Sequence, residues 1–297
     1  MNKPSRKFLR LWPHHVRDIG LNALTFLSSV GARKRLPDEE MKKQLHWFEK
    51  NDLAAGPSSF IGDTLTLLSW NVFKGFHEHK LVSIMHDLVR EHQPDAIVFQ
   101  EAPMYTDGSF LEWPDEFSPV SLTYISSQKK RPGVYEFEHT GELTAARMPH
   151  SKASFHLLPK ITNQKHFKDT EYLHRNFLYT QWQTRAGSLG LYNIHLESIT
   201  TPRSRLAEVH DLYDVVEKND DDITILAGDF NTIMGTTLEP AMQFFKRKGF
   251  INGLKPGIKQ WVPRLDHIFV RGAKGIKTTL FPRIGSDHKP AVAKIQF

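Results

Sequence analysis

Apolar residues recur along this chain with two different periods, which predict an alternation of buried strands and amphipathic helices. Runs rich in β-branched and other apolar residues predict core strands at 65–72, 96–101 and 223–226. Between the first two runs, apolar residues repeat at helical intervals of three and four and so share one face: Leu81, Ile84, Met85, Leu88 and Val89. This predicted helix ends near Pro94, so the segment forms a strand–helix–strand unit.

The rest of the chain continues this alternation. Further strands are predicted at 141–148, 175–184 and 188–196, the last two as a hairpin. A second amphipathic helix opens near Pro202, a third covers about 238–248, and three strands close the chain. The polar stretch 102–140 is expected to form surface excursions. Strands that alternate with helices and also pair as hairpins predict an α/β fold, with two sheets packed together and helices outside.

The first 60 residues differ from the remainder, so we expect an N-terminal extension at 1–60 and one large domain at 61–297. Residues 1–35 begin with cations and continue with an apolar run at 19–30, which is shorter than the ~20 residues of a membrane span. An export signal, a helix lying on a membrane surface and a packed or disordered tail are the three alternatives for this segment. Residues 37–50 are predicted to form a short helix, because the segment starts acidic and ends basic.

Composition is that of an ordinary globular protein, with 39% hydrophobic and 24% charged residues in 297. The absence of cysteine excludes disulfides, zinc–thiolate sites and cysteine nucleophiles. The net charge of +6 would suggest a polyanionic partner, but residues 1–60 hold 11 Lys and Arg against 6 Asp and Glu. The large domain is therefore close to neutral, and its charge alone does not argue for a nucleic-acid groove.

The candidate chemistry centres on the end of the predicted strand at 223–226. Gly228 breaks the apolar run, and Asp229 and Asn231 follow just past the strand end. Because alternate residues of an extended chain point to the same side, a carboxylate and a carboxamide face one site. Such groups suit a hard cation or a phosphate-bound water, although the same residues also favour an ordinary tight turn.

Four other strand-like runs carry polar residues of the same kind. Asn71, Glu101 and Asp266 lie in three of them, and a Gly-Ser-Asp-His-Lys-Pro segment with Asp287 and His288 precedes the last strand. This ordered set resembles the endonuclease/exonuclease/phosphatase superfamily over roughly 62–297. The resemblance implies a four-layer α/β/β/α sandwich of two packed mixed sheets, and a metal-dependent hydrolase acting on phosphoric esters.

The predicted metal residues are Glu101, Asn71 and Asp287. With Asp229 and Asn231 they offer only oxygen ligands, which favour Mg²⁺, or Mn²⁺ as a substitute, over zinc. Glu101 is the strongest candidate because a carboxylate at the end of a buried strand is costly unless it is paired or coordinated. A structural pair with Lys or Arg is the alternative for Glu101, and a strand-end cap is the alternative for Asn71.

The resemblance also implies a catalytic pair in which Asp266 fixes the tautomer of His288. Histidine suits a general base because its pKa lies near neutrality. Whether His288 or Asp229 accepts the proton of the attacking water stays open, and both side chains are expected at solvent-accessible loop ends. His267 is expected on the opposite face of its strand, either at the surface or in packing.

Phosphate contacts are implied for Arg175, His195 and Asn231. His195 matches the histidine of the family's Asn-x-His-Leu strand, which implies a hydrogen bond to phosphate or proton transfer to the leaving oxygen. Arg175 opens a strand where nuclease-like members place a phosphate-contacting arginine. The alternatives are a core histidine for His195 and a surface ion pair for Arg175.

These assignments predict hydrolysis of a phosphodiester by in-line attack of water, without a covalent enzyme intermediate. Nucleic acid is slightly favoured over lipid as substrate, because Arg175 and His195 together resemble a nuclease. The alternatives are a phospholipid or phosphoinositide hydrolase that contacts a membrane through residues 1–35, and a non-catalytic adaptor. We expect a cytoplasmic monomer, with peripheral membrane association or export through residues 1–35 left open.

Overall fold

The computed structural model describes most of the large predicted domain. The described residues are 45–50, 62–72, 78–104, 116–125, 139–159, 175–198, 200–232, 239–254 and 264–297. All of them belong to one compact unit, formed by Pro37–Ile161 with Leu173–Phe297. The predictions for residues 1–35 therefore lie outside the described residues. Among the described residues, no helix has the length and apolar character needed to span a membrane.

The described residues of this unit form two mixed sheets and three helices. The first sheet has the strand order β1-β4-β5-β3-β2-β13-β12: β1 Leu45–Glu49, β2 Thr64–Asn71, β3 Ala96–Met104, β4 Ser118–Ile125, β5 His139–Ala146, β12 Gly275–Leu280 and β13 Ala291–Gln296. The second has the order β10-β11-β9-β8-β7-β6: β6 Lys152–Leu157, β7 Asn176–Thr184, β8 Gly187–His195, β9 Ile223–Asp229, β10 Ile251–Asn252 and β11 Asp266–Arg271. The helices are α3 Glu78–His92, α4 Pro202–Asn219 and α5 Pro240–Arg247.

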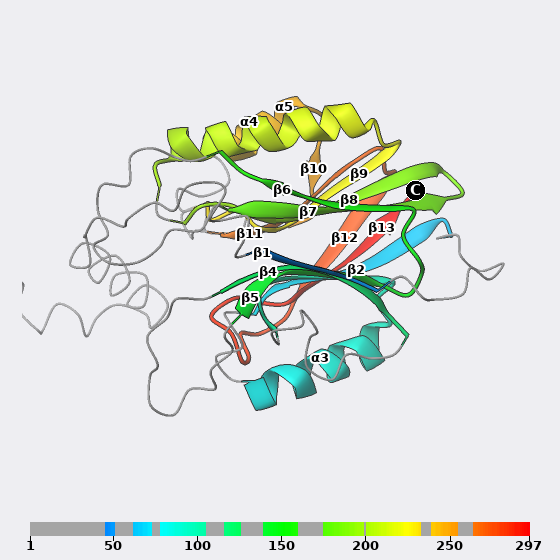
Figure 1. The fold of residues 1–297 in the computed structure, drawn as a ribbon. Coiled ribbons are helices and arrows are strands. Elements are labelled where there is room, and N and C mark those ends of the chain that lie inside the picture. The colour runs from blue at the N-terminus through cyan, green and yellow to red at the C-terminus, as the bar shows by residue number, and fades with distance from the viewer. Residues whose placement is uncertain are drawn as a thin grey trace, which may run out of the picture. The chain divides into compact units, whose positions relative to one another are not determined.

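The alternation of side chains along the strands explains the four layers. In β2, Leu65 and Leu67 enter the core between the two sheets, whereas Leu68 and Trp70 pack on the opposite face with α3. In β9, Ile225 enters the same inter-sheet core, and neighbouring residues pack against α4 and α5. Figure 1 shows α3 on one side of the sheets and α4 with α5 on the other. The predicted α/β/β/α sandwich is confirmed.

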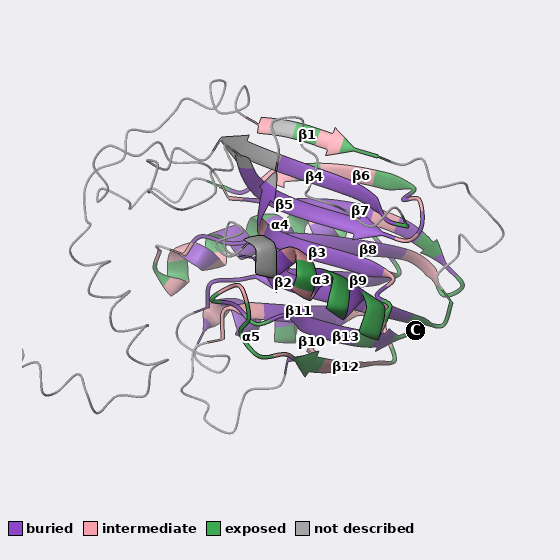
Figure 2. Cartoon of the chain, turned by 90° about the horizontal axis from the view of Figure 1, so that it is seen from below, coloured by how far each residue is buried: buried purple, intermediate pink, exposed green. Residues whose placement is uncertain are grey.

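Parallel pairing brings the polar strand ends together. Strands β2 and β3 are parallel, and so are β8 and β9. The register places Asp229 beside His195 of β8 and, on its other side, beside Asp266 of the antiparallel β11. Figure 2 shows that these inner strands are mostly buried, whereas β12 at the edge carries exposed residues. The candidate residues therefore converge on one edge of a rigid scaffold.

Gly228 permits the close approach of β9 to β8. Its φ of +140° is a conformation that L side chains rarely adopt, and a Cβ there would lie 2.1 Å from the backbone oxygen of Ile194. Only glycine avoids this overlap. The glycine that interrupts the apolar run is thus required by the strand geometry that presents Asp229.

Four strands differ from the sequence expectations, and one of them is β10, because four strands follow α5 where three were predicted. The segment predicted as a helix at 37–50 contains β1, which pairs antiparallel with β4, so the helix prediction is wrong for Leu45–Glu49. The stretch 102–140, expected as surface excursions, contains β4, which pairs with β1 and β5. Strand β6 was not predicted and pairs with β7. Part of the predicted extension at 1–60 therefore adds an edge strand to the first sheet, and the division near residue 60 stays a prediction.

Candidate active site

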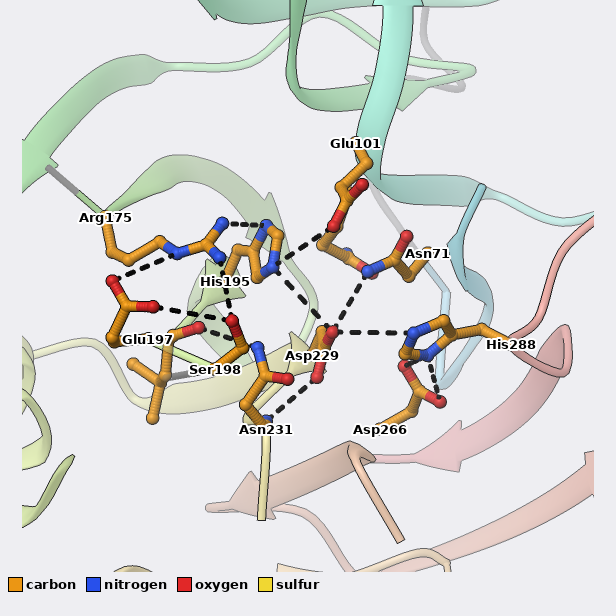
Figure 3. Close-up of polar contacts among 12 residues, drawn as sticks. Asn71, Glu101, Arg175, His195, Glu197, Ser198, Asp229, Asn231, Asp266 and His288 are labelled. Carbon is orange, nitrogen blue, oxygen red and sulfur yellow. Dashed lines mark hydrogen bonds and ion pairs between the residues drawn. The ribbon is translucent and has the colours of Figure 1, made fainter. Parts of the chain in front are cut away.

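Asp229 is the centre of the polar cluster at the strand ends (Figure 3). Its side chain accepts a hydrogen bond from Asn71 Nδ2 at 3.0 Å and another from the backbone N–H of Asn231 at 2.8 Å. The Nε2 atoms of His195 and His288 each lie 3.8 Å from Asp229 Oδ2. Burial raises the pKa of Asp229 to about 6, although the positive charge of His288 opposes this shift. A carboxylate with this pKa can take up a proton near neutral pH.

Asp266 and His288 form the expected pair. Nδ1 of His288 lies 2.9 Å from both carboxylate oxygens of Asp266, so Nε2 faces Asp229. Burial by itself would lower the pKa of His288, but Asp266 and Asp229 outweigh it and raise this pKa to about 10. The imidazole is therefore a cation at neutral pH in the metal-free protein.

The loop that carries His288 is anchored to the end of β2. Ser286 Oγ donates to the backbone oxygen of Asn71 at 2.7 Å and accepts from the backbone N–H of His288 at 3.0 Å. Trp70 Nε1 adds a longer contact of 3.4 Å to the backbone oxygen of His288. The serine of the Gly-Ser-Asp-His segment thus fixes the histidine relative to Asn71.

Both proposed proton-transfer residues are more buried than the sequence suggested. Asp229 is 2% exposed and His288 is 8% exposed, so the expectation of solvent-accessible loop ends is wrong. Asp229 is the last residue of β9 rather than a loop residue. Burial raises the pKa of Asp229, whereas the pKa of His288 is raised by Asp266 and Asp229 against the effect of burial.

Glu101 has the features of a metal ligand. Its Oε1 lies 3.8 Å from Nε2 of His195, and its buried Oε2 has no hydrogen-bond partner among the described residues. The residue has a φ of +52° and lies at an irregularity of register in β3 between Phe99 and Ala102. A buried carboxylate oxygen without a partner is costly unless a cation compensates it. These observations fit the predicted role of Glu101.

Asp287 completes the acidic side of the cluster. Its Oδ1 lies 3.7 Å from Nε2 of His288, and its side chain is 49% exposed. Burial raises the pKa of Asp287, and the charge of Glu101 contributes to this shift. The charges of the two carboxylates, Asp287 and Glu101, therefore repel each other. A second arrangement of metal-ligating groups is formed by Asp229, Asp266 and His288, whose ligand atoms lie within 4.8 Å of one another.

We favour the oxygen-rich set for a metal over the cluster that includes His288. Nδ1 of His288 is already engaged by Asp266. Glu101, in contrast, offers a carboxylate oxygen that the described protein groups leave unused.

His195 is buried and stands between two sets of charges. Its Nε2 faces Asp229 and Glu101, while its Nδ1 lies 3.2 Å from Nη1 of Arg175 and 3.3 Å from Oε1 of Glu142. Glu142 is 1% exposed, and burial raises its pKa to about 8. Glu142, which lies inside β5, is a site residue that was not predicted from the sequence.

Arg175 and Asn231 flank this histidine. Arg175 Nε lies 3.8 Å from Oε2 of Glu197, and its Nη2 donates to Ser198 Oγ at 3.4 Å. Asn231 has a φ of +50° and uses one N–H of its side chain to bond the backbone oxygen of Leu196 at 2.8 Å. Arg175 is thus in an ion pair, but with residues of the site rather than with a remote surface group.

His267 belongs to packing rather than to the surface. It is fully buried, with Nε2 at 2.8 Å from Thr232 Oγ1 and Nδ1 at 2.9 Å from Asn252 Nδ2. Burial lowers its pKa to about 4, so the ring is neutral at physiological pH. Of the two histidines near Asp266, His288 is therefore a charged residue of the site and His267 is a neutral residue of the core.

The fold and this cluster define the chain as a hydrolase of phosphoester bonds. It belongs to the Endonuclease/Exonuclease/phosphatase family, whose sequence pattern matches residues 68–288. That range contains all nine predicted site residues. Members of this family generally depend on a divalent metal. In a separate comparison, no curated protein matches the chain.

Solved structures with the same fold differ widely in sequence. The catalytic domain of human Nocturnin with bound sulfate has a TM-score of 0.58 and 15% identity, and the match covers 86% of this chain and 98% of that one. An endonuclease/exonuclease/phosphatase from Beutenbergia cavernae DSM 12333 has a TM-score of 0.55 and 14% identity, and the match covers 79% of this chain and 72% of that one. A mannosyl-6-phosphatase from Bacteroides thetaiotaomicron VPI-5482 has a TM-score of 0.51 and 15% identity, and the match covers 78% of this chain and 100% of that one. Identities this low show the fold alone.

Proposed function

We propose that this protein is a Mg²⁺-dependent phosphodiesterase that hydrolyses its substrate by direct, in-line attack of water. The observation that carries the proposal is the position of Asp229, which is buried between two histidines. One of them, His195, also faces Glu101, whose Oε2 has no hydrogen-bond partner among the described residues. This arrangement combines a proton acceptor, positive charge and a cation site around one small volume. Such a combination suits phosphoryl transfer, which depends mainly on positioning and charge stabilisation.

Glu101, Asn71 and Asp287 are the proposed metal residues. Their donor atoms are carboxylate and amide oxygens, which Mg²⁺ prefers, and Mn²⁺ can replace it. The unused Oε2 of Glu101 supports this assignment. When bound, the cation supplies Lewis-acid polarisation of the phosphate and neutralises charge on the leaving oxygen.

We propose that Asp229 accepts the proton of the attacking water. Its pKa of about 6 lies close to neutral pH, and hydrogen bonds from Asn71 and Asn231 hold its two oxygens in place. His288, oriented by Asp266, carries a positive charge that stabilises the charge developing on the phosphate. This assignment makes Asp229 the base rather than His288, a choice that the sequence alone did not decide.

Arg175, His195 and Asn231 are proposed to bind the scissile phosphate. Arg175 supplies a guanidinium that can bind two phosphate oxygens at once. His195 reaches toward the same volume through Nε2, which faces Asp229 and Glu101. Asn231 retains a second side-chain N–H beyond the one bonded to Leu196.

For the substrate class, nucleic acid remains slightly favoured over lipid. The pairing of Arg175 with His195 at 3.2 Å supports a nuclease-like phosphate site. A lipid phosphoester is the second candidate, favoured by the cations and apolar run of residues 1–35. An adaptor without activity is the third, and the clustering of the predicted metal and histidine residues argues against it.

A substrate screen tests the proposal. Purified protein with Mg²⁺ is assayed on plasmid DNA, RNA, a small phosphodiester, a phosphomonoester and anionic vesicles that contain phospholipid or phosphoinositide. Hydrolysis of DNA or RNA supports the favoured substrate class, and hydrolysis of vesicle lipid supports the second candidate. Deleting residues 1–35 should then weaken binding to whichever polyanionic substrate the segment contacts. No hydrolysis of any substrate contradicts the proposed function.

A further inference from the structure

Arg175 is held by residues that the active-site chemistry does not yet explain. Glu197 places its Oε2 3.8 Å from Nε of Arg175, and its side chain is almost fully buried. Ser198 accepts from Nη2 of Arg175 and donates to Oε1 of Glu197, each at 3.4 Å. Arg175 therefore contacts the segment that follows β8 through two of its three guanidinium nitrogens, as Figure 3 shows.

Helix α4 holds the backbone of Glu197 on both sides. Glu208 Oε2 accepts from the N–H of Glu197 at 3.1 Å, and Arg205 Nε donates to its backbone oxygen at 3.2 Å. Arg205 and Glu208 are one helical turn apart on the buried face of α4. A loop residue has no strand partner for its backbone, and here two buried side chains supply both hydrogen bonds.

A second helix secures this arrangement. Arg205 Nη1 lies 3.0 Å from Oε1 of Glu239, the N-cap residue of α5, and both side chains are fully buried. Buried ion pairs of this kind add little net stability because removing both charges from water is costly. In some proteins they instead help to select one geometry. Here the pair joins Arg205, which also holds the backbone oxygen of Glu197, to α5.

The contacts of Arg175 define which of its donors remain for a ligand. Each guanidinium nitrogen has one contact, with Nε facing Glu197, Nη1 facing His195 and Nη2 bonded to Ser198. A guanidinium has five N–H groups. Two are left among the described residues, one on each terminal nitrogen, and the two terminal nitrogens of a guanidinium can bind two oxygens of a phosphate.

We propose that Glu197 is a positioning residue for Arg175, and that Arg205 and Glu208 of α4 fix Glu197 in the orientation that directs this fork at phosphate. The proposal rests on the proposed function, in which Arg175 binds the scissile phosphate. It assigns a role in phosphate recognition to three buried side chains on or beside α4. None of the three touches the substrate.

A double-mutant cycle tests this role. Glu197→Gln keeps the shape of the side chain and removes its charge. We expect it to raise KM for a small phosphodiester, and the inhibition constant of inorganic phosphate, by about tenfold, with a smaller change in kcat. In an Arg175→Ala background the same substitution should have no further effect, because the group that it positions is gone. Effects that add in the two backgrounds would overturn the proposal.

The helix is tested separately. Glu208→Gln retains an acceptor for the N–H of Glu197 and should keep near-normal phosphate inhibition, whereas Glu208→Leu removes the acceptor and should reproduce the Glu197→Gln defect. Arg271→Gln is the control, since it breaks a 2.7 Å pair with Glu217 on the same helix, outside the site residues. Thermal melting identifies variants that fail to fold. A Glu208→Leu variant that folds and is inhibited by phosphate as strongly as the wild type would overturn the proposal.

One more measurement separates this inference from the proposed function. Calorimetric titration of the wild-type protein and the Glu197→Gln variant with inorganic phosphate needs no substrate turnover. Wild-type protein that hydrolyses no phosphodiester would contradict the proposed function, and a tenfold loss of phosphate affinity in the variant would still support the positioning role. Equal affinity in both proteins would overturn the positioning role even if the enzyme is active.

Discussion

Asp266 presents both of its carboxylate oxygens to Nδ1 of His288, each at 2.9 Å, and thereby turns Nε2 of that histidine toward Asp229. Asp229 and Asp266 lie opposite each other in the register of β9 and β11. One charged imidazole is thus bracketed by two carboxylates from neighbouring strands. This relationship connects the fold to the chemistry, because strand pairing alone sets the spacing of the two carboxylates.

The first prediction is that Asp266 and His288 act as one unit. Asp266→Asn and His288→Ala should each lower kcat/KM by ~10²–10⁴, since each removes a charge or the group that orients it. The double variant should lose little more than the worse single variant, because residues that act as a unit are not additive. The measurement is steady-state hydrolysis of a small phosphodiester at pH 7. Losses that multiply in the double variant would show that the two residues act independently.

The second prediction concerns two histidines that titrate in opposite directions. The pKa of His288 is raised to about 10, mainly by Asp266, and that of His267 is lowered to about 4 by burial. In the metal-free protein, NMR titration of the imidazole signals should find His288 protonated at pH 8 and His267 neutral at pH 5. The reverse order, or two ordinary values near 6.5, would disprove this electrostatic picture.

The lowered pKa of His267 makes the stability of the protein depend on pH. Its folded-state pKa lies below the unfolded value, so the unfolded chain binds the proton first as pH falls. The neutral ring of His267 therefore contributes on the order of 3 kcal/mol to the free energy of unfolding above pH ~6.5, and this contribution is lost as the pH falls toward ~4. Relative to the wild type, His267→Gln should show a weaker decline in the free energy of unfolding over this range. If urea denaturation gives the same pH dependence of the free energy of unfolding for the wild type and the variant, this prediction is wrong.

The third prediction is a metal requirement. EDTA should abolish hydrolysis of a generic phosphodiester, and Mg²⁺ or Mn²⁺ should restore it. Glu101→Gln should weaken Mn²⁺ binding measured by calorimetry, because it removes the carboxylate whose Oε2 has no protein partner among the described residues. Asp211→Asn, on α4 and outside the predicted ligand set, is the control. Full activity after exhaustive chelation would exclude the proposed mechanism.

The fourth prediction concerns Gly228. Gly228→Ala places a Cβ 2.1 Å from the backbone oxygen of Ile194 at a φ of +140°, so β8 and β9 must separate. We expect a loss of more than ~3 kcal/mol in the free energy of unfolding, together with lost activity. Gly249→Ala is the matched control, because Gly249 has a φ of +82° and no described residue places an atom within 4 Å of the new Cβ. It should cost only ~1 kcal/mol.

Much of the site could be predicted from the sequence because its residues stand at recognisable strand ends. Asn71, Glu101 and Asp229 each follow a buried apolar run, and the structure places them together where those runs end. The pairing of Asp266 with His288 also has the expected partners. Local periodicity identifies such strands, and the turn residues show where the chain leaves them.

The rest depends on contacts between distant segments. The residues of β1 at 45–49 show no strand alternation, and this segment becomes a strand because β4 offers it an edge. Glu142 lies within β5, where a charged residue would normally face solvent, and it is buried only because His195 and Arg175 lie opposite. Arg205 and Glu239 are likewise brought together by the packing of α4 and α5. Sequence periodicity carries no information about such partners.

The most direct test of the account is the rate of Asp229→Asn in the presence of Mg²⁺. Asp229 contacts Asn71 and Asn231 and faces both histidines, so every proposed step depends on it. The substitution keeps the size of the side chain and removes the proton acceptor. The account predicts a loss of ~10²–10⁴ in turnover of a small phosphodiester, with a melting temperature within a few degrees of the wild type. A folded variant with near-normal turnover would contradict it.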